Sequence, residues 1–125
     1  MSRELSIGVD HHERAGCTVI IVAGDIDRNS SELLRGTIER LVSDYRSRIV
    51  IDARDITFCD STGLRALLSG ARMTSEAGGW LRLAEVSDVL KRLLQMTGLY
   101  AWFLIDADVA ASLAHTTHRD PRLPD

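Results

Sequence analysis

Segment 17–23, which reads Cys-Thr-Val-Ile-Ile-Val-Ala, constrains the fold more than any other part of the chain. It is rich in β-branched residues and carries no charge, a composition that predicts a β-strand. Because nearly every side chain in it is apolar, both faces of the strand must be buried, which is typical of a parallel sheet covered by helices. We therefore expect an α/β protein, and the 125 residues of the chain suffice for one domain.

The rest of the chain alternates between strand patterns and helix patterns. Further strands are predicted over residues 5–10, 48–53, 80–84 and 101–105. Apolar residues at spacings of three and four predict four helices, which begin near Asn29 or Ser30, at Asp60, after the cap Ser87, and after the cap Asp106 or Asp108. Strands joined by a helix run parallel in right-handed crossovers, whereas the first two strands can pair as an antiparallel hairpin. The predicted fold is a small α/β sandwich with a mostly parallel sheet, an N-terminal antiparallel hairpin and about four helices.

Further expectations concern the helix starts, the loops and the end of the chain. Asn29 and Glu32 resemble a capping box at the start of the first helix, with Ser30 as the competing cap. Segments 24–29 and 54–59 are predicted as loops. The domain is expected to span residues 1–115, followed by a disordered tail over residues 116–125 that contains both prolines. The first helix is expected to bury one apolar stripe, which consists of Leu33, Leu34, Ile38, Leu41, Val42 and Tyr45.

Composition and charge argue against several classes of protein. With 15 basic and 18 acidic residues the net charge is −3, so a nucleic-acid-binding protein, which needs a basic surface, is not expected. The longest apolar run without charge, residues 17–24, is much shorter than the roughly 20 residues of a membrane helix. No secretory signal is visible, and two isolated cysteines favour neither a disulfide framework nor a zinc site. We therefore expect a cytoplasmic protein with reduced thiols that contacts neither nucleic acid nor membrane.

The candidate site lies where the strand at residues 48–53 leads towards the second helix. Asp60, Ser61, Thr62 and Gly63 follow one another at the start of that helix. In open α/β sheets, ligands bind beyond the carboxyl ends of the strands, and a helix N-terminus stabilises an anion. An exposed hydroxyl at this position is suited to accept a phosphoryl group. The same residues also fit a purely structural role, in which a helix cap is followed by a glycine that allows close packing.

A resemblance to a known family rests on residues 51–64, which read Ile-Asp-Ala-Arg-Asp-Ile-Thr-Phe-Cys-Asp-Ser-Thr-Gly-Leu. This pattern resembles the central motif of the STAS domain, the fold of bacterial anti-sigma-factor antagonists. Residues 24–27, Gly-Asp-Ile-Asp, are similar to an acidic segment of that family, and the resemblance covers nearly the whole chain. It implies that Ser61 is phosphorylated, with Thr62 as the less favoured acceptor. It also implies that Asp27 and Asp60 lie beside the phosphorylation site.

The resemblance further implies a partner and a switch. Antagonists of this family bind an anti-sigma factor that is also a serine kinase with an ATP-binding fold of the histidine-kinase type. Phosphorylation abolishes this binding, and a separate serine phosphatase resets the protein. Arg65 departs from the family pattern, because many members have glycine at its position. The partner-binding surface around the phosphorylation site is then expected to include Asp27, Asp60, Thr62, Gly63, Leu64 and Arg65.

The resulting hypothesis is a regulatory protein without catalytic residues, cofactor or metal: an anti-sigma-factor antagonist that is switched by phosphorylation at Ser61. Two alternatives lie within the same family, namely a scaffold or sensor that is not phosphorylated, and an accessory subunit of a lipid-transport system. An alternative of another class is a small hydrolase or phosphatase with Ser61 or Cys59 as its nucleophile. The chain has no Gly-x-Ser-x-Gly motif, no Walker loop and no Gly-x-Gly-x-x-Gly loop, which argues against hydrolysis and against nucleotide binding.

Overall fold

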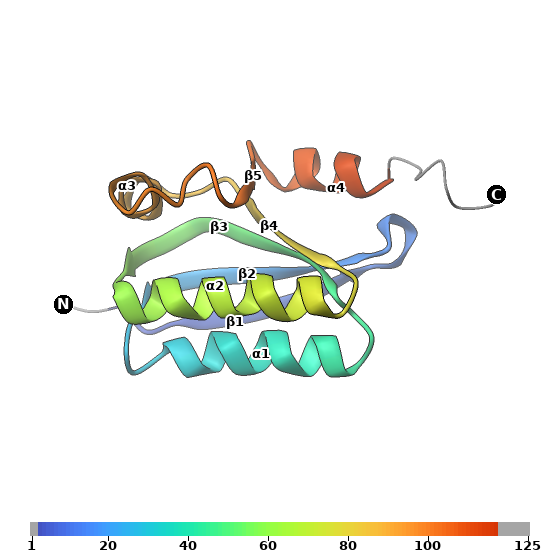
Figure 1. The fold of residues 1–125 in the computed structure, drawn as a ribbon, viewed down its shortest axis with the longest axis horizontal. Helices are drawn as coiled ribbons and strands as arrows, with labels where there is room; N and C mark the ends of the chain where they lie inside the picture. Colours follow the sequence, from blue (N-terminus) through green and yellow to red (C-terminus); the bar gives the residue numbers. More distant parts are fainter. Residues whose placement is uncertain (1–2, 118–125) are drawn as a thin grey trace.

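A five-stranded sheet forms the centre of the computed structural model, which describes residues 3–117 (Figure 1). β1 pairs antiparallel with β2, and the other neighbouring strands pair in parallel. The predicted mostly parallel sheet with an N-terminal hairpin is therefore confirmed. The strands follow one another across the sheet in chain order: β1 (Ser6–His12), β2 (Cys17–Ile26), β3 (Arg48–Cys59), β4 (Trp80–Ala84) and β5 (Leu104–Asp106).

Four α-helices connect or follow the strands within residues 3–117: α1 (Ser31–Ser43), α2 (Ser61–Glu76), α3 (Asp88–Met96) and α4 (Val109–Thr117). In Figure 1, α1 and α2 lie side by side and begin at the same end of the molecule. A short 3-10 helix, Glu13–Ala15, forms the turn between β1 and β2. α4 extends two residues beyond the predicted end of the domain. The rest of the predicted tail, residues 118–125, lies outside the described residues.

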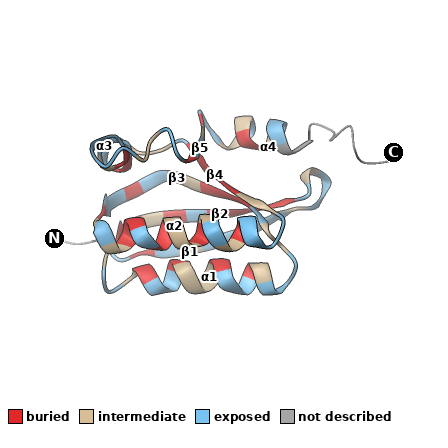
Figure 2. Ribbon diagram, in the orientation of Figure 1, coloured by how far each residue is buried: buried red, intermediate tan, exposed pale blue. Residues whose placement is uncertain are grey.

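Side chains of β2 and β3 alternate between two apolar clusters, one on each face of the sheet. Figure 2 shows buried residues along both strands. Ile20 and Ile51 are fully buried on the face that α1 and α2 cover. Val19 and Val50 point to the other face, where apolar residues of α4 pack against them. Each buried side chain of this size contributes about 1.5–3 kcal/mol. The predicted burial of segment 17–23, in β2, on both faces is thus confirmed, although Ile21 remains 41% exposed.

β3 extends to Cys59, so the prediction of a loop over residues 54–59 is wrong. Two shifts of register, each with one extra residue on β3, interrupt its pairing with β2. In this half of the strand, burial therefore falls on every third residue, Ala53, Ile56 and Cys59. A bulge breaks the two-residue alternation by which a strand is identified, so the sequence carries no strand pattern here. β2 likewise runs to Ile26, into the other segment that is predicted as a loop.

The last strand is shorter and begins later than predicted. Pairing with β4 covers only Leu104–Asp106. The preceding residues form a turn, in which the amides of Trp102 and Phe103 both donate to the carbonyl oxygen of Leu99, at 3.0 and 3.2 Å. The prediction of a strand over residues 101–105 is therefore wrong at its start, because local turn bonds replace ladder bonds there.

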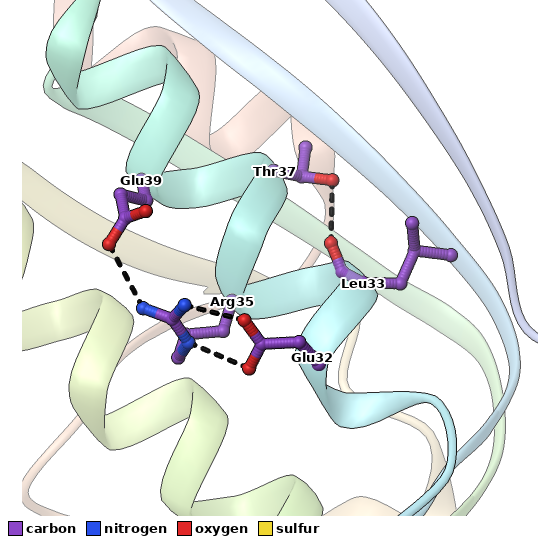
Figure 3. Close-up of polar contacts among 5 residues, drawn as sticks. All are labelled: Glu32, Leu33, Arg35, Thr37 and Glu39. Carbon is purple, nitrogen blue, oxygen red and sulfur yellow. Dashed lines mark hydrogen bonds and ion pairs between the residues drawn. The ribbon is translucent and has the colours of Figure 1, made fainter.

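The start of α1 does not contain the predicted capping box. Glu32 pairs with Arg35 instead of reaching back to Asn29, and the same guanidinium contacts a second glutamate one turn further on (Figure 3). Ser30 stands at the position before the helix, but its side chain makes no cap bond. Asp27 instead holds the loop before the helix, since its Oδ1 accepts hydrogen bonds from the amides of Asn29 and Ser30 at 2.9 and 3.0 Å.

Two residues of the predicted apolar stripe of α1 are exposed. Leu33 is 54% exposed, and its carbonyl oxygen accepts a hydrogen bond from the Thr37 hydroxyl at 2.7 Å (Figure 3). Tyr45 is 96% exposed because the helix has already ended. The Arg46 amide turns back to the Leu41 carbonyl oxygen at 2.8 Å, which places Tyr45 in the left-handed region with φ of 62°. The residues of the stripe that the structure buries are Leu34, Ile38 and Leu41, with Val42 half-buried.

The side chain of Asp106 connects β4, β5 and α4. Its carboxylate accepts two hydrogen bonds from Arg82, at 2.7 and 3.0 Å, and one from the Ser112 hydroxyl at 2.6 Å. Only 5% of this side chain is exposed, and the Arg82 guanidinium holds the pKa of Asp106 below its ordinary value. Of the two predicted caps of the last helix, Asp108 is therefore the one that caps it, with the Ala111 amide 2.8 Å from its Oδ1.

The substitution Asp106→Asn should lower the free energy of unfolding at pH 7 by about 2–3 kcal/mol, because it leaves Arg82 without its ionic partner. Since folding lowers the pKa of Asp106, its contribution is complete above the unfolded pKa of about 3.9 and is lost as the pH falls through the folded value. Urea unfolding between pH 7 and pH 2 measures both effects. The difference between wild type and variant should narrow at acid pH, and a constant difference would contradict the role of the ionised carboxylate.

Candidate functional site

The ends of β2 and β3 bring two helix starts together. Ile26 and Cys59 form the last pair between these strands. One residue further on, the amide of Asp60 donates to the carbonyl oxygen of Ile26 at 3.2 Å. α1 follows β2 and α2 follows β3, so both helices begin at this edge of the sheet (Figure 1). The candidate residues at the start of α2 therefore lie beyond the carboxyl ends of parallel strands, as the sequence predicts.

Asp60 fixes the start of α2. Its backbone is extended, with φ of −100°, and its Oδ1 accepts a hydrogen bond from the amide of Gly63 at 2.9 Å. Its carbonyl oxygen accepts the first bond of the helix from Leu64, also at 2.9 Å. The carboxylate thereby satisfies one of the amides that a helix start leaves unpaired. The structural role of a cap, one of the two roles predicted for this motif, is confirmed.

Gly63 allows α2 to pack directly on the end of β2. A Cβ atom at this position would lie 2.4 Å from the carbonyl oxygen of Ile26 and 2.9 Å from the sulfur of Cys59, where no side chain fits. Leu64, the next residue, is 7% exposed and belongs to the main apolar cluster. The first turn of α2 is therefore fixed from the side of the sheet.

The opposite side of the same turn faces solvent. Ser61 occupies the first position of α2 and is exposed, and its hydroxyl takes part in none of the side-chain hydrogen bonds within residues 3–117. Thr62 is half-buried. Arg65 is exposed and forms no ion pair in the part of the chain that the structure describes. A group that approaches from solvent meets the hydroxyl of Ser61 before that of Thr62.

Asp27 lies in the neighbouring loop, directly after Ile26, and is half-buried. Its carboxylate accepts hydrogen bonds from the amides of Asn29 and Ser30, so it points into its own loop. Among residues 3–117, no hydrogen bond joins Asp27 to Ser61. The structure thus brings this loop to the start of α2 through the carbonyl oxygen of Ile26, and not through the acidic side chain.

Sequence reasoning missed two side chains behind the site. The Thr57 hydroxyl donates to Asp25 Oδ1 at 2.6 Å, and the amide of Arg3 donates to Oδ2 at 2.8 Å. These bonds, that of Thr57 first, lower the pKa of Asp25. They tie the ends of β2 and β3 to the N-terminal segment. The only sequence signal was the acidic segment around Asp25, because nothing in the sequence pairs it with a threonine so far along the chain.

Burial makes Cys59 unsuitable as a nucleophile. Its side chain belongs to the main apolar cluster, and its sulfur lies 3.6 Å from the carbonyl oxygen of Asp60. Burial, and in second place the charge of Asp60, raise the pKa of Cys59 to about 12. At neutral pH almost no reactive thiolate is present. The structure therefore gives no support to a hydrolase that uses this cysteine.

The fold and the site define a small α/β domain that presents one free hydroxyl on a rigid helix start. Within residues 3–117, no three His, Cys, Asp or Glu side chains gather where they could hold a metal ion. No helix of that region has the length and apolar character needed to cross a membrane. The chain belongs to the STAS domain family, whose model, described as "Mlab, STAS domain", matches residues 9–106. The resemblance drawn from the sequence motifs is therefore confirmed.

One sequence relative and two solved structures indicate how far the similarity extends. The chain is 33% identical over 97 residues to the anti-sigma-B factor antagonist of Bacillus subtilis (strain 168), which covers 76% of this chain and 86% of the relative. The fold of this chain matches that of the anti-sigma factor antagonist SpoIIAA in its unphosphorylated form with a TM-score of 0.78 and 21% identity. The match covers 92% of this chain and 99% of the other. The same fold matches the Bacillus cell fate determinant SpoIIAA in the phosphorylated form with a TM-score of 0.69 and 22% identity, over 88% and 98%.

The substitution Gly63→Ala should destabilise the protein by about 1–3 kcal/mol, because its new methyl group would meet the backbone of Ile26. Gly36→Ala is the matched control, since Gly36 lies within α1 and has nothing within 4 Å of the added Cβ. That control should stabilise the protein by about 0.5–1 kcal/mol. Thermal unfolding followed by circular dichroism measures both variants. Similar shifts for the two would disprove the close contact between α2 and β2.

Cys59 should not react with a thiol reagent such as dithionitrobenzoate in the folded protein at pH 8, because the pKa of its thiol is raised to about 12 and its side chain is buried. Cys17 is buried as well. Both thiols should react promptly once the protein is unfolded in urea. Absorbance of the released thiolate measures the rate, and fast reaction of Cys59 in the folded state would reopen the hydrolase alternative.

Proposed function

We propose that this protein is an anti-sigma-factor antagonist, which binds an anti-sigma factor when Ser61 is unphosphorylated and releases it when Ser61 is phosphorylated. The anti-sigma factor is itself the serine kinase, of the histidine-kinase-like ATPase type, and a serine phosphatase resets the switch in the cytoplasm. One observation carries the proposal: the exposed, unengaged hydroxyl of Ser61 stands on a helix start that Asp60 and Gly63 hold in place. The chain that presents it is 33% identical to an anti-sigma-B factor antagonist.

In this reaction the protein is the acceptor and the kinase provides the reactive groups. Ser61 Oγ attacks the γ-phosphorus of the kinase-bound Mg-ATP, an Oγ–P bond forms, the bond to the β–γ bridging oxygen breaks, and ADP leaves. The carboxylate of Asp60 is engaged by the amide of Gly63 at 2.9 Å. In the proposed reaction the hydroxyl proton passes to a base of the kinase. The protein acts as a substrate and binding partner, without catalytic residues of its own.

Phosphorylation is expected to change the surface more than the fold. A phosphate adds about −1.5 to −2 charges at pH 7, and a helix start stabilises an anion by about 0.3–1 kcal/mol. Gly63 and Leu64, which anchor α2, lie on the buried side of the turn. Against a partner surface that fits a neutral hydroxyl, the same charge costs several kcal/mol. The likeness of this fold to SpoIIAA in both forms supports a switch that acts at the interface.

Incubation with the cognate kinase and ATP should place one phosphate on Ser61, which mass spectrometry of the digested protein locates. Ser61→Ala should abolish the modification, because the acceptor oxygen is missing. Thr62→Val is the matched control, since it removes the neighbouring hydroxyl at nearly constant volume and should leave the modification intact. Phosphate on Thr62, or phosphorylation that persists in Ser61→Ala, would overturn the assignment.

The same proteins test the switch itself. The phosphorylated protein should bind the anti-sigma factor at least about tenfold more weakly, a loss of 1.4 kcal/mol or more, while its melting temperature shifts by a few degrees at most. Ser61→Ala should bind whether or not ATP is present. Isothermal titration calorimetry measures the affinities. Unchanged affinity of the phosphorylated protein, or loss of its fold, would contradict a switch at the interface.

The alternatives predict other outcomes in these experiments. A scaffold, a sensor or an accessory subunit of a lipid-transport system would bind its partner without ever being phosphorylated. A hydrolase or phosphatase that uses Ser61 would turn over an ester or phosphate substrate in the absence of any partner. The exposed setting of Ser61 disfavours the hydrolase, because neither a histidine nor an acidic side chain is hydrogen-bonded to its hydroxyl within residues 3–117.

A further inference from the structure

We propose that Arg65 is the internal counter-ion of phosphorylated Ser61, so that the phosphate is held against the exposed face of α2. This inference rests on the phosphorylation of Ser61 proposed above and adds a residue that receives the new charge. The regulatory ion pair lies within this chain, and its formation requires no movement of the backbone.

Ser61 and Arg65 are one helical turn apart in α2, and both are exposed. Side chains at this spacing are neighbours, with Cβ atoms about 5–6 Å apart. Long side chains in a helix lean towards its N-terminus. From this position the guanidinium of Arg65 can reach a phosphate on Ser61.

A phosphate on Ser61 and the guanidinium of Arg65 are chemically complementary. A phosphate offers three acceptor oxygens, and an arginine presents a planar fork of donors that binds two of them at once. An anion that precedes a cation by four residues is the favourable order for an ion pair in a helix. In the unmodified protein, Arg65 makes no ion pair among residues 3–117, so no existing partner must be displaced.

Other charged side chains lie at this edge of the sheet. The carboxylate of Asp60 accepts a hydrogen bond from an amide in the first turn of α2, and that of Asp27 accepts from amides of its own loop. They are therefore already engaged, and their negative charge opposes the phosphate instead of binding it. Arg28 is a second exposed cation, in the loop after β2. It lies on a different element, so its contribution can be separated from that of Arg65 by substitution.

The test is a phosphorus NMR titration of the full chain with phosphoserine incorporated at position 61 during synthesis, so that it does not depend on the cognate kinase. A neighbouring cation favours the doubly charged phosphate and lowers its second pKa, which is about 6 in an isolated phosphoserine. Arg65→Gln should raise this pKa by about 0.3 unit or more. The difference should shrink when salt is raised from low concentration to about 1 M, where the screening length is only about 3 Å.

Arg72→Gln is the matched control. Arg72 is exposed on the same helix two turns further on, and it lies too far away to reach position 61. This control should leave the phosphate pKa unchanged. The proposal is overturned if Arg65→Gln has no effect, if the control shifts the pKa equally, or if Arg28→Gln produces the shift in place of Arg65→Gln. Failure of the kinase to modify Ser61 would instead refute the proposed function, because this titration bypasses the kinase.

Discussion

The pairing of β2 with β3 is the interaction on which the rest of the structure depends. It runs from Thr18 and Ile49 to Ile26 and Cys59, far beyond the stretch that β4 joins. Its first half carries the apolar side chains that bind helices to both faces of the sheet. Its second half brings two helix starts to the same edge. Only Asp60 separates β3 from α2, so the position of the exposed Ser61 follows from the register of β2 and β3.

Most of the fold could be predicted from the sequence because its elements have regular patterns. Segment 17–23 of β2 is almost entirely apolar, and α2 and α3 begin with residues that cap helices, Asp60 and Ser87. The errors fall where a pattern depends on partners far along the chain. Residues 54–59 carry two bulges set by β2, so their burial has a period of three and not two. Tyr45 fits the apolar spacing of α1, but the helix ends before it, through a backbone bond that involves no particular side chain.

The candidate site likewise has features that could be predicted from the sequence and features that could not. Asp60, Ser61 and Gly63 could be placed at a helix start, because caps and glycines are visible in a sequence. The position of Asp27 also follows from the motif, but its carboxylate points into its own loop. The contact that holds the site together, the carbonyl oxygen of Ile26 against α2, could not be predicted. Every residue has such an oxygen, so only the folded chain reveals which one a glycine must accommodate.

The two bulges in β3 also determine where the length of this chain can vary. Each bulge places one extra residue opposite β2, so the loss of one residue within segment 54–58 would remove one of the two bulges and leave Ile26 opposite Cys59. Beyond Cys59 no bulge provides an extra residue that could be lost. One residue fewer between Cys59 and Gly63 would turn the following helix by about 100° relative to the sheet and rotate the serine away from its present direction. Among relatives of this protein, small gaps before Cys59 are therefore compatible with an unchanged site, whereas a gap after it marks a domain whose surface is built differently.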